Sequence, residues 1–109
     1  MLTRRLRLLI ALAAVLVGVS AVSALASGKT VKVGDNYYGP KTLTVGKGTK
    51  VTWNWVGVLK HNIVVRRGPS SFESKTQVRG SYTHTFTQKG TYDLVCTIHP
   101  SMKMTVVVR

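Results

Sequence analysis

Apolar and polar residues alternate in short runs from residue 30 onward, and glycine interrupts these runs. The run 50–56 is the clearest, because Val51, Trp53 and Trp55 fall on one face of an extended strand. Strands are predicted at 30–33, 41–45, 50–56, 61–66, 81–87, 91–96 and 103–108. Tyr92 has the position of the corner tyrosine that ties a loop back in such folds. Since no helical period is present here, the pattern predicts an all-β fold, an antiparallel Greek-key β-sandwich.

The first 26 residues have the features of a cleavable secretory signal. Three arginines precede an apolar run, 8–26, which ends in the small residues Ala24 and Ala26. We expect cleavage after Ala26, which leaves 27–109 as one exported domain in the periplasm, at the cell envelope or outside the cell. An uncleaved membrane anchor is the alternative, because the apolar run is just long enough to cross a bilayer.

The chain is strongly basic, with 16 lysines and arginines against three acidic residues and a net charge of +13. Removal of 1–26, with its three arginines, would leave a net charge of about +10. The charges are scattered, and the aromatic residues have strand-core spacing rather than the pattern of a nucleic-acid surface. The composition therefore argues against nucleic acid and favours an acidic protein partner or anionic envelope material.

The chain has one cysteine, Cys96, and it stands at the end of the predicted strand 91–96. Alternation along that strand points the thiol inward. His99 and Met102 follow in one short loop, which Pro100 stiffens. Such a soft-donor set selects copper or zinc over hard cations, although an inert buried thiol is the alternative interpretation.

A blue copper site needs two histidines and a cysteine, with methionine as a weak axial ligand, so a second histidine must come from elsewhere. His61 opens a strand after a loop, whereas His84 lies in the middle of a strand, so His61 is the expected ligand. Met104 shares a face with the apolar residues of the closing strand and is expected in the core. Met102 is therefore the expected axial ligand.

Two segments carry a family resemblance. "HNIVV" and "GTYDLVCTIHPSM", the latter followed by a valine-rich strand, resemble the cupredoxins, in particular small plastocyanin- and amicyanin-like bacterial proteins. The spacing Cys-x-x-His-x-x-Met is similar to the short amicyanin loop, and the resemblance covers 30–109. It implies that one copper ion is bound by His61, Cys96, His99 and Met102. It also implies that Asn62 bridges the two ligand loops toward Thr97. The alternative is that Asn62 is a polar residue at the start of a strand, hydrogen-bonded to nearby backbone.

The resemblance implies a one-electron carrier that alternates between Cu(I) and Cu(II) and exchanges electrons with redox proteins. The second hypothesis is a copper-binding protein for delivery, storage or resistance. An enzyme is not expected, because a catalytic copper needs an open coordination position. Zinc is the competing metal, although structural zinc sites seldom use methionine. We expect the small domain to be a monomer, and its three acidic residues argue against an acidic recognition patch.

Overall fold

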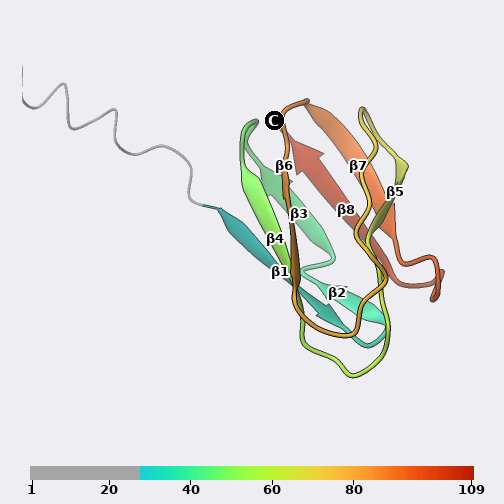
Figure 1. The fold of residues 1–109 in the computed structure, drawn as a ribbon. Coiled ribbons are helices and arrows are strands. Elements are labelled where there is room, and N and C mark those ends of the chain that lie inside the picture. The colour runs from blue at the N-terminus through green and yellow to red at the C-terminus, as the bar shows by residue number, and fades with distance from the viewer. Residues whose placement is uncertain (1–27) are drawn as a thin grey trace, which may run out of the picture.

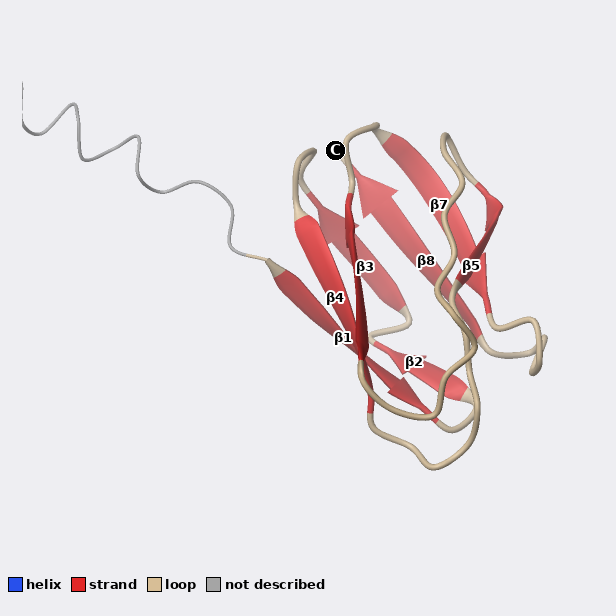
Figure 2. Cartoon of the chain, viewed as in Figure 1, coloured by secondary structure: helices blue, strands red, loops and turns tan. Residues whose placement is uncertain are grey.

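Two four-stranded sheets pack face to face in the part of the chain that the computed structural model describes, residues 28–109 (Figure 1). The strands are β1 (Lys29–Gly34), β2 (Tyr37–Gly39), β3 (Thr42–Val45), β4 (Lys50–Trp55), β5 (Val64–Arg67), β6 (Ser81–Thr85), β7 (Gly90–Val95) and β8 (Lys103–Val108). The described residues form strands and loops without a helix, so none could cross a membrane as a helix (Figure 2). The predicted signal, 1–26, lies outside them.

The two sheets are mixed, with strand orders β2-β1-β4-β6 and β3-β8-β7-β5. The β-sandwich prediction is confirmed, but two pairs, β1 with β4 and β3 with β8, are parallel rather than antiparallel. The parallel pairing of β1 with β4 follows from the crossover, since β3 leaves the first sheet for the second before the chain returns as β4.

The alternation of apolar and polar residues in the sequence matches the alternation of buried and exposed side chains in the strands. Both β4 and β8 bury every second side chain against the opposite sheet. Trp53, Phe86 and Tyr92 are among the largest fully buried side chains. The Tyr92 hydroxyl donates a hydrogen bond of 2.8 Å to the Gln88 carbonyl, as expected of a corner tyrosine.

Most predicted strand ends differ from the observed ones by one or two residues, and two differences are larger. Residues 37–39, expected in a turn-rich connection, form the short strand β2 after a two-residue turn at Asp35 and Asn36. Asn36 has a φ of 71°, a conformation that asparagine tolerates better than most residues, so the chain can reverse here. The strand predicted from His61 begins only at Val64, because His61 pairs with Gln77 outside the sheets.

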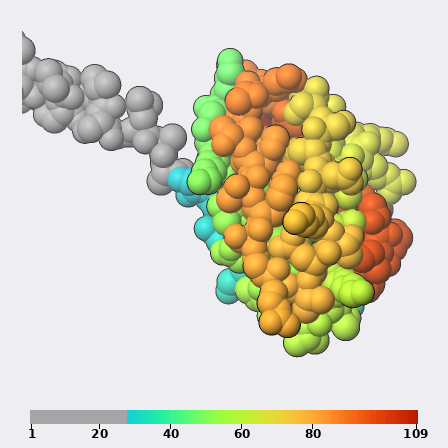
Figure 3. Space-filling view, in the orientation of Figure 1, coloured from blue at the N-terminus to red at the C-terminus, as the bar shows by residue number. Residues whose placement is uncertain are grey.

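The segment between β5 and β6 crosses from the edge strand of one sheet to the edge strand of the other. Together with β6 it forms much of the yellow and orange surface in Figure 3. Its anchor is Phe72, which packs against the core and stacks on His84 with 3.7 Å between ring centroids. His84 is thereby held in the middle of β6.

Three connections gather at one end of the sandwich, the lower end in Figure 1. They are the β1–β2 turn, the β4–β5 loop and the β7–β8 loop. Contacts between Asp35 and His61 and between Asn62 and Thr97 join them. The predicted metal site belongs to this end.

Candidate metal centre

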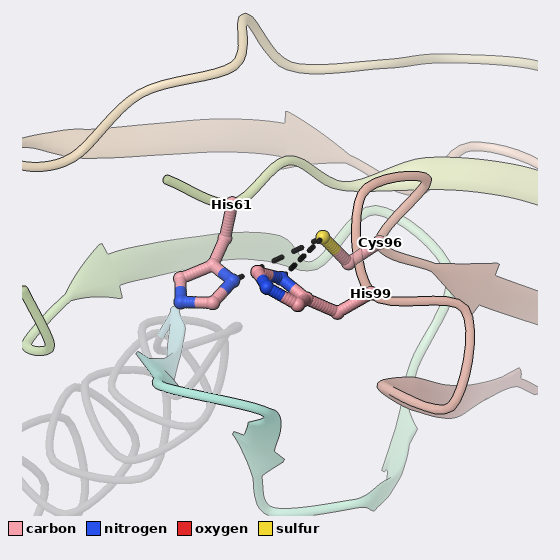
Figure 4. A group of neighbouring side chains, drawn as sticks. All are labelled: His61, Cys96 and His99. Carbon is pink, nitrogen blue, oxygen red and sulfur yellow. Dashed lines mark hydrogen bonds between the residues drawn. The ribbon is translucent and has the colours of Figure 1, made fainter. Parts of the chain in front are cut away.

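His61, Cys96 and His99 come together between the β4–β5 and β7–β8 loops (Figure 4). One ligand atom from each lies within 4.8 Å of the others. Each histidine places its Nδ1 atom 3.9 Å from the Cys96 sulfur. His61 and Cys96 are fully buried, and His99 is partly exposed.

These distances fit a single ion between the three side chains. Thiolate and imidazole donors about 2.3 and 2.0 Å from one metal, at a trigonal angle, are about 3.7 Å apart. The observed 3.9 Å from the sulfur to each nitrogen is close to that separation. A soft thiolate with two imidazoles is also the donor set that copper prefers.

The β7–β8 loop owes its shape to two backbone hydrogen bonds across it. The Cys96 amide donates to the Met102 carbonyl at 3.0 Å, and the Met102 amide donates to the His99 carbonyl at 2.8 Å. The ladder between β7 and β8 begins directly outside this loop, with Val95 opposite Lys103. Cys96 points inward, as alternation predicts, and the Met102 side chain is buried.

The backbone of His61 is held on both sides. Its amide and carbonyl form reciprocal 3.0 Å hydrogen bonds with Gln77, and Trp55 Nε1 donates to the same carbonyl at 3.2 Å. The His61 ring therefore has little freedom to move. Its Nδ1 atom faces the thiol, while Nε2 lies 2.9 Å from Asp35 Oδ1.

Asp35 contacts the predicted site although the sequence did not indicate it. Its carboxylate also accepts hydrogen bonds from the amides of Val58 and Leu59, at 3.1 to 3.2 Å. The bond with His61, and then the two amides, lower the pKa of Asp35 below its usual 3.8, so the group is ionised at neutral pH. The one available signal was a carboxylate in a tight turn, and a turn of this kind does not reveal its distant partner.

Asn62 joins the two ligand-bearing loops. Its side-chain oxygen accepts the Thr97 amide at 2.9 Å, and its nitrogen donates to the Thr97 hydroxyl at 2.8 Å. A longer contact of 3.4 Å reaches Thr76. The Tyr38 hydroxyl donates to the Asn62 carbonyl at 2.6 Å, and burial raises the pKa of Tyr38, which keeps it a neutral donor.

The remaining candidates lie in strands rather than in the loops that carry the cluster. His84 is stacked on Phe72 in β6, and burial lowers its pKa below 6.5. Met104 is buried in β8 opposite Leu94, within the hydrophobic core. The structure therefore places His61 rather than His84 beside Cys96 and His99. Met102 and Met104 are both buried in the core, so the choice of Met102 as axial ligand stays a prediction.

The fold and the donor set together define a class. A β-sandwich that holds a buried thiol between two imidazoles, with a methionine in the same loop, has the residue types of a blue copper centre. The chain belongs to the plastocyanin/azurin family of copper-binding proteins, whose family model matches residues 26–109. Its cofactor is copper, and the resemblance to cupredoxins is confirmed.

Amicyanins are among its relatives. The chain is 33% identical to amicyanin-alpha of Methylorubrum extorquens, over 91% of this chain and 97% of that protein. It is 29% identical to amicyanin of Paracoccus versutus, over 87% of this chain and 64% of that protein. A reduced Cu(I) form of an amicyanin mutant has a TM-score of 0.69 at 30% identity, covering 82% of this chain and 89% of that one.

A copper enzyme also contains a similar domain. The Cu-containing nitrite reductase of Thermus scotoductus has a TM-score of 0.70 at 32% identity, over 76% of this chain. This chain spans only 22% of the reductase. The similarity is therefore to one part of that enzyme and does not extend to the whole.

Proposed function

We propose that this chain is an exported blue copper protein that carries single electrons between redox partners. The proposed ligands are His61, Cys96 and His99, with Met102 as the weak axial ligand. The observation that carries the proposal is the buried Cys96 thiol with an imidazole Nδ1 atom 3.9 Å away on each side.

The surroundings of the site favour electron transfer over catalysis. Bound copper supplies the Cu(II)/Cu(I) couple, so an electron received from a reduced partner is passed to an oxidised one. Hydrogen bonds within the protein hold His61 and the Cys96 loop, so neither has to move when the charge changes. His61 and Cys96 are fully buried, so neither presents an exposed atom to a substrate. Delivery and storage proteins more often have open sites rich in methionine or histidine, and this chain has only three of each.

His99 is the proposed point of electron entry and exit, because it is the partly exposed member of the set. Apolar side chains are exposed in the two loops around it, with Ile98 46% and Val58 77% exposed. Such a surface allows close and short-lived contact with a partner. The net charge, +13 for the whole chain and about +10 without residues 1–26, favours a partner with an acidic surface. Export rests on the signal predicted at 1–26, and we propose that the domain is a monomer.

The first test is the visible absorption spectrum of the purified protein with Cu(II). An intense blue thiolate band is expected in the wild type and should be absent in Cys96→Ser. His61→Gln and His99→Gln should also lose the band, whereas the matched control His84→Gln should keep it. Copper binding without a blue band, or a band that persists in Cys96→Ser, would overturn the proposal.

The two methionines are distinguished by the reduction potential of the copper-loaded protein. A weak axial ligand tunes this potential without creating the thiolate band. Met102→Leu is therefore expected to keep the blue colour and to change the potential. Met104→Leu is the control, and a larger shift in Met104→Leu than in Met102→Leu would overturn the axial assignment.

A further inference from the structure

The two imidazoles of the site have different partners. His61 is fully buried, and its Nε2 atom lies 2.9 Å from the carboxylate of Asp35, which is 30% exposed. For His99 the described residues offer no carboxylate, since neither Asp93 nor Glu73 contacts it. Only one side of the site is therefore adjacent to a negative charge.

The contact with Asp35 determines where the His61 proton lies. An ionised carboxylate can only accept a hydrogen bond, so Nε2 must carry the hydrogen. In the neutral ring, Nδ1 then has a lone pair, and this is the atom that faces the Cys96 sulfur. The Nε2–H tautomer is thus the one that satisfies the carboxylate and leaves a metal-binding nitrogen toward the thiol.

The position of Asp35 does not depend on His61 alone. The amides of Val58 and Leu59 donate to its carboxylate from the β4–β5 loop. The loop can approach this closely because residue 57 is glycine, and a Cβ atom there would collide with the Asp35 carboxylate. The carboxylate is therefore fixed by the β1–β2 turn and by the loop that leads to His61.

We propose that Asp35 is a positioning residue of the copper centre, which holds His61 as the Nε2–H tautomer and lowers the reduction potential. This inference rests on the proposed function. A nearby negative charge interacts more favourably with Cu(II) than with Cu(I), because the oxidised ion has the larger charge. A carboxylate bonded to a ligating histidine also raises the basicity of that ligand.

Two substitutions separate the hydrogen bond from the charge. Asp35→Asn removes the charge, yet its side-chain oxygen can still accept from Nε2–H. Asp35→Ala removes both. Asp93→Asn is the matched control, since it makes the same charge change at an exposed residue of β7 that does not contact His61.

The reduction potential tests the charge. We expect Asp35→Asn to weaken Cu(II) binding about tenfold relative to Cu(I), which raises the potential by about 59 mV for a one-electron couple. Asp93→Asn should shift it much less, because solvent and salt screen an exposed charge. Equal shifts in Asp35→Asn and Asp93→Asn would overturn the electrostatic role.

The ring-nitrogen NMR shifts of His61 in the metal-free protein test the tautomer. The wild type and Asp35→Asn should show a protonated Nε2, and Asp35→Ala should show a mixture of tautomers. An unchanged Nε2–H signal in Asp35→Ala would overturn the positioning role. A wild-type protein that lacks the blue band would overturn the proposed function instead, and the ring-nitrogen spectra would still decide the tautomer.

Discussion

Replacement of Asn62 by alanine removes both strong hydrogen bonds between the His61 loop and the Cys96 loop. These bonds join Asn62 to the Thr97 amide at 2.9 Å and to the Thr97 hydroxyl at 2.8 Å. Each is worth about 1 kcal/mol, so we expect the free energy of unfolding to fall by about 2 kcal/mol. The 3.4 Å contact with Thr76 is near the limit of a hydrogen bond and adds little.

A loss of this size is large for so small a domain. With roughly 80 ordered residues, its total stability is expected to be about 4–12 kcal/mol. The Tm of Asn62→Ala should therefore fall by about 8–16 °C. Urea titration of the metal-free protein measures the same loss without a contribution from copper binding.

Thr97→Val is the partner variant, because it removes the hydroxyl and keeps the backbone amide. It should cost about 1 kcal/mol. The double variant should cost about as much as Asn62→Ala alone, since the Thr97 hydroxyl has already lost its partner in the single variant. Full additivity of the two losses, or a loss below about 0.5 kcal/mol in Asn62→Ala, would refute the bridge as a source of stability.

Three further predictions concern the stability of variants in other parts of the domain. Tyr92→Phe loses the 2.8 Å bond to Gln88 and should cost about 1 kcal/mol in urea titration; an unchanged midpoint would contradict this. Met104→Ala opens a cavity in the core and should cost about 2–5 kcal/mol while the blue band persists, and loss of the band would count against its core assignment. Burial lowers the pKa of His84, so the unfolded state binds more protons and stability falls as pH drops below 6.5. His84→Gln should lose this decline, and an identical pH profile of unfolding in both proteins would contradict it.

The sequence predicted the strands best where alternation is strict. The runs that became β4 and β8 bury every second residue, because side chains in a strand alternate between its two faces. The short strand β2 was missed, since its three residues, 37–39, lie among residues typical of turns. The parallel pairing of β1 with β4 could not be predicted either, because it depends on which sheet β3 joins.

The contacts at the site also differ in whether the sequence could predict them. Cys96, His99 and Met102 lie within seven consecutive residues, so their proximity is a local property of one loop. The choice of His61 needed only its place at a strand start, among the chain's three histidines. Asp35 is 26 residues away from His61, and their contact exists only because the β1–β2 turn and the β4–β5 loop meet at one end of the sandwich.

The contacts at this end of the sandwich form a continuous series that leaves the proposed donor atoms out. Asp35 joins the β1–β2 turn to the loop before His61, Asn62 joins that loop to Thr97, and backbone bonds close the loop from Cys96 to Met102. These bonds do not use the Cys96 sulfur or the Nδ1 atoms of the two histidines. The loops are therefore held by hydrogen bonds that keep the same partners when the charge of the ion changes. That constancy is what a rapid electron carrier requires, because movement of the ligands between oxidation states would add to the barrier for transfer.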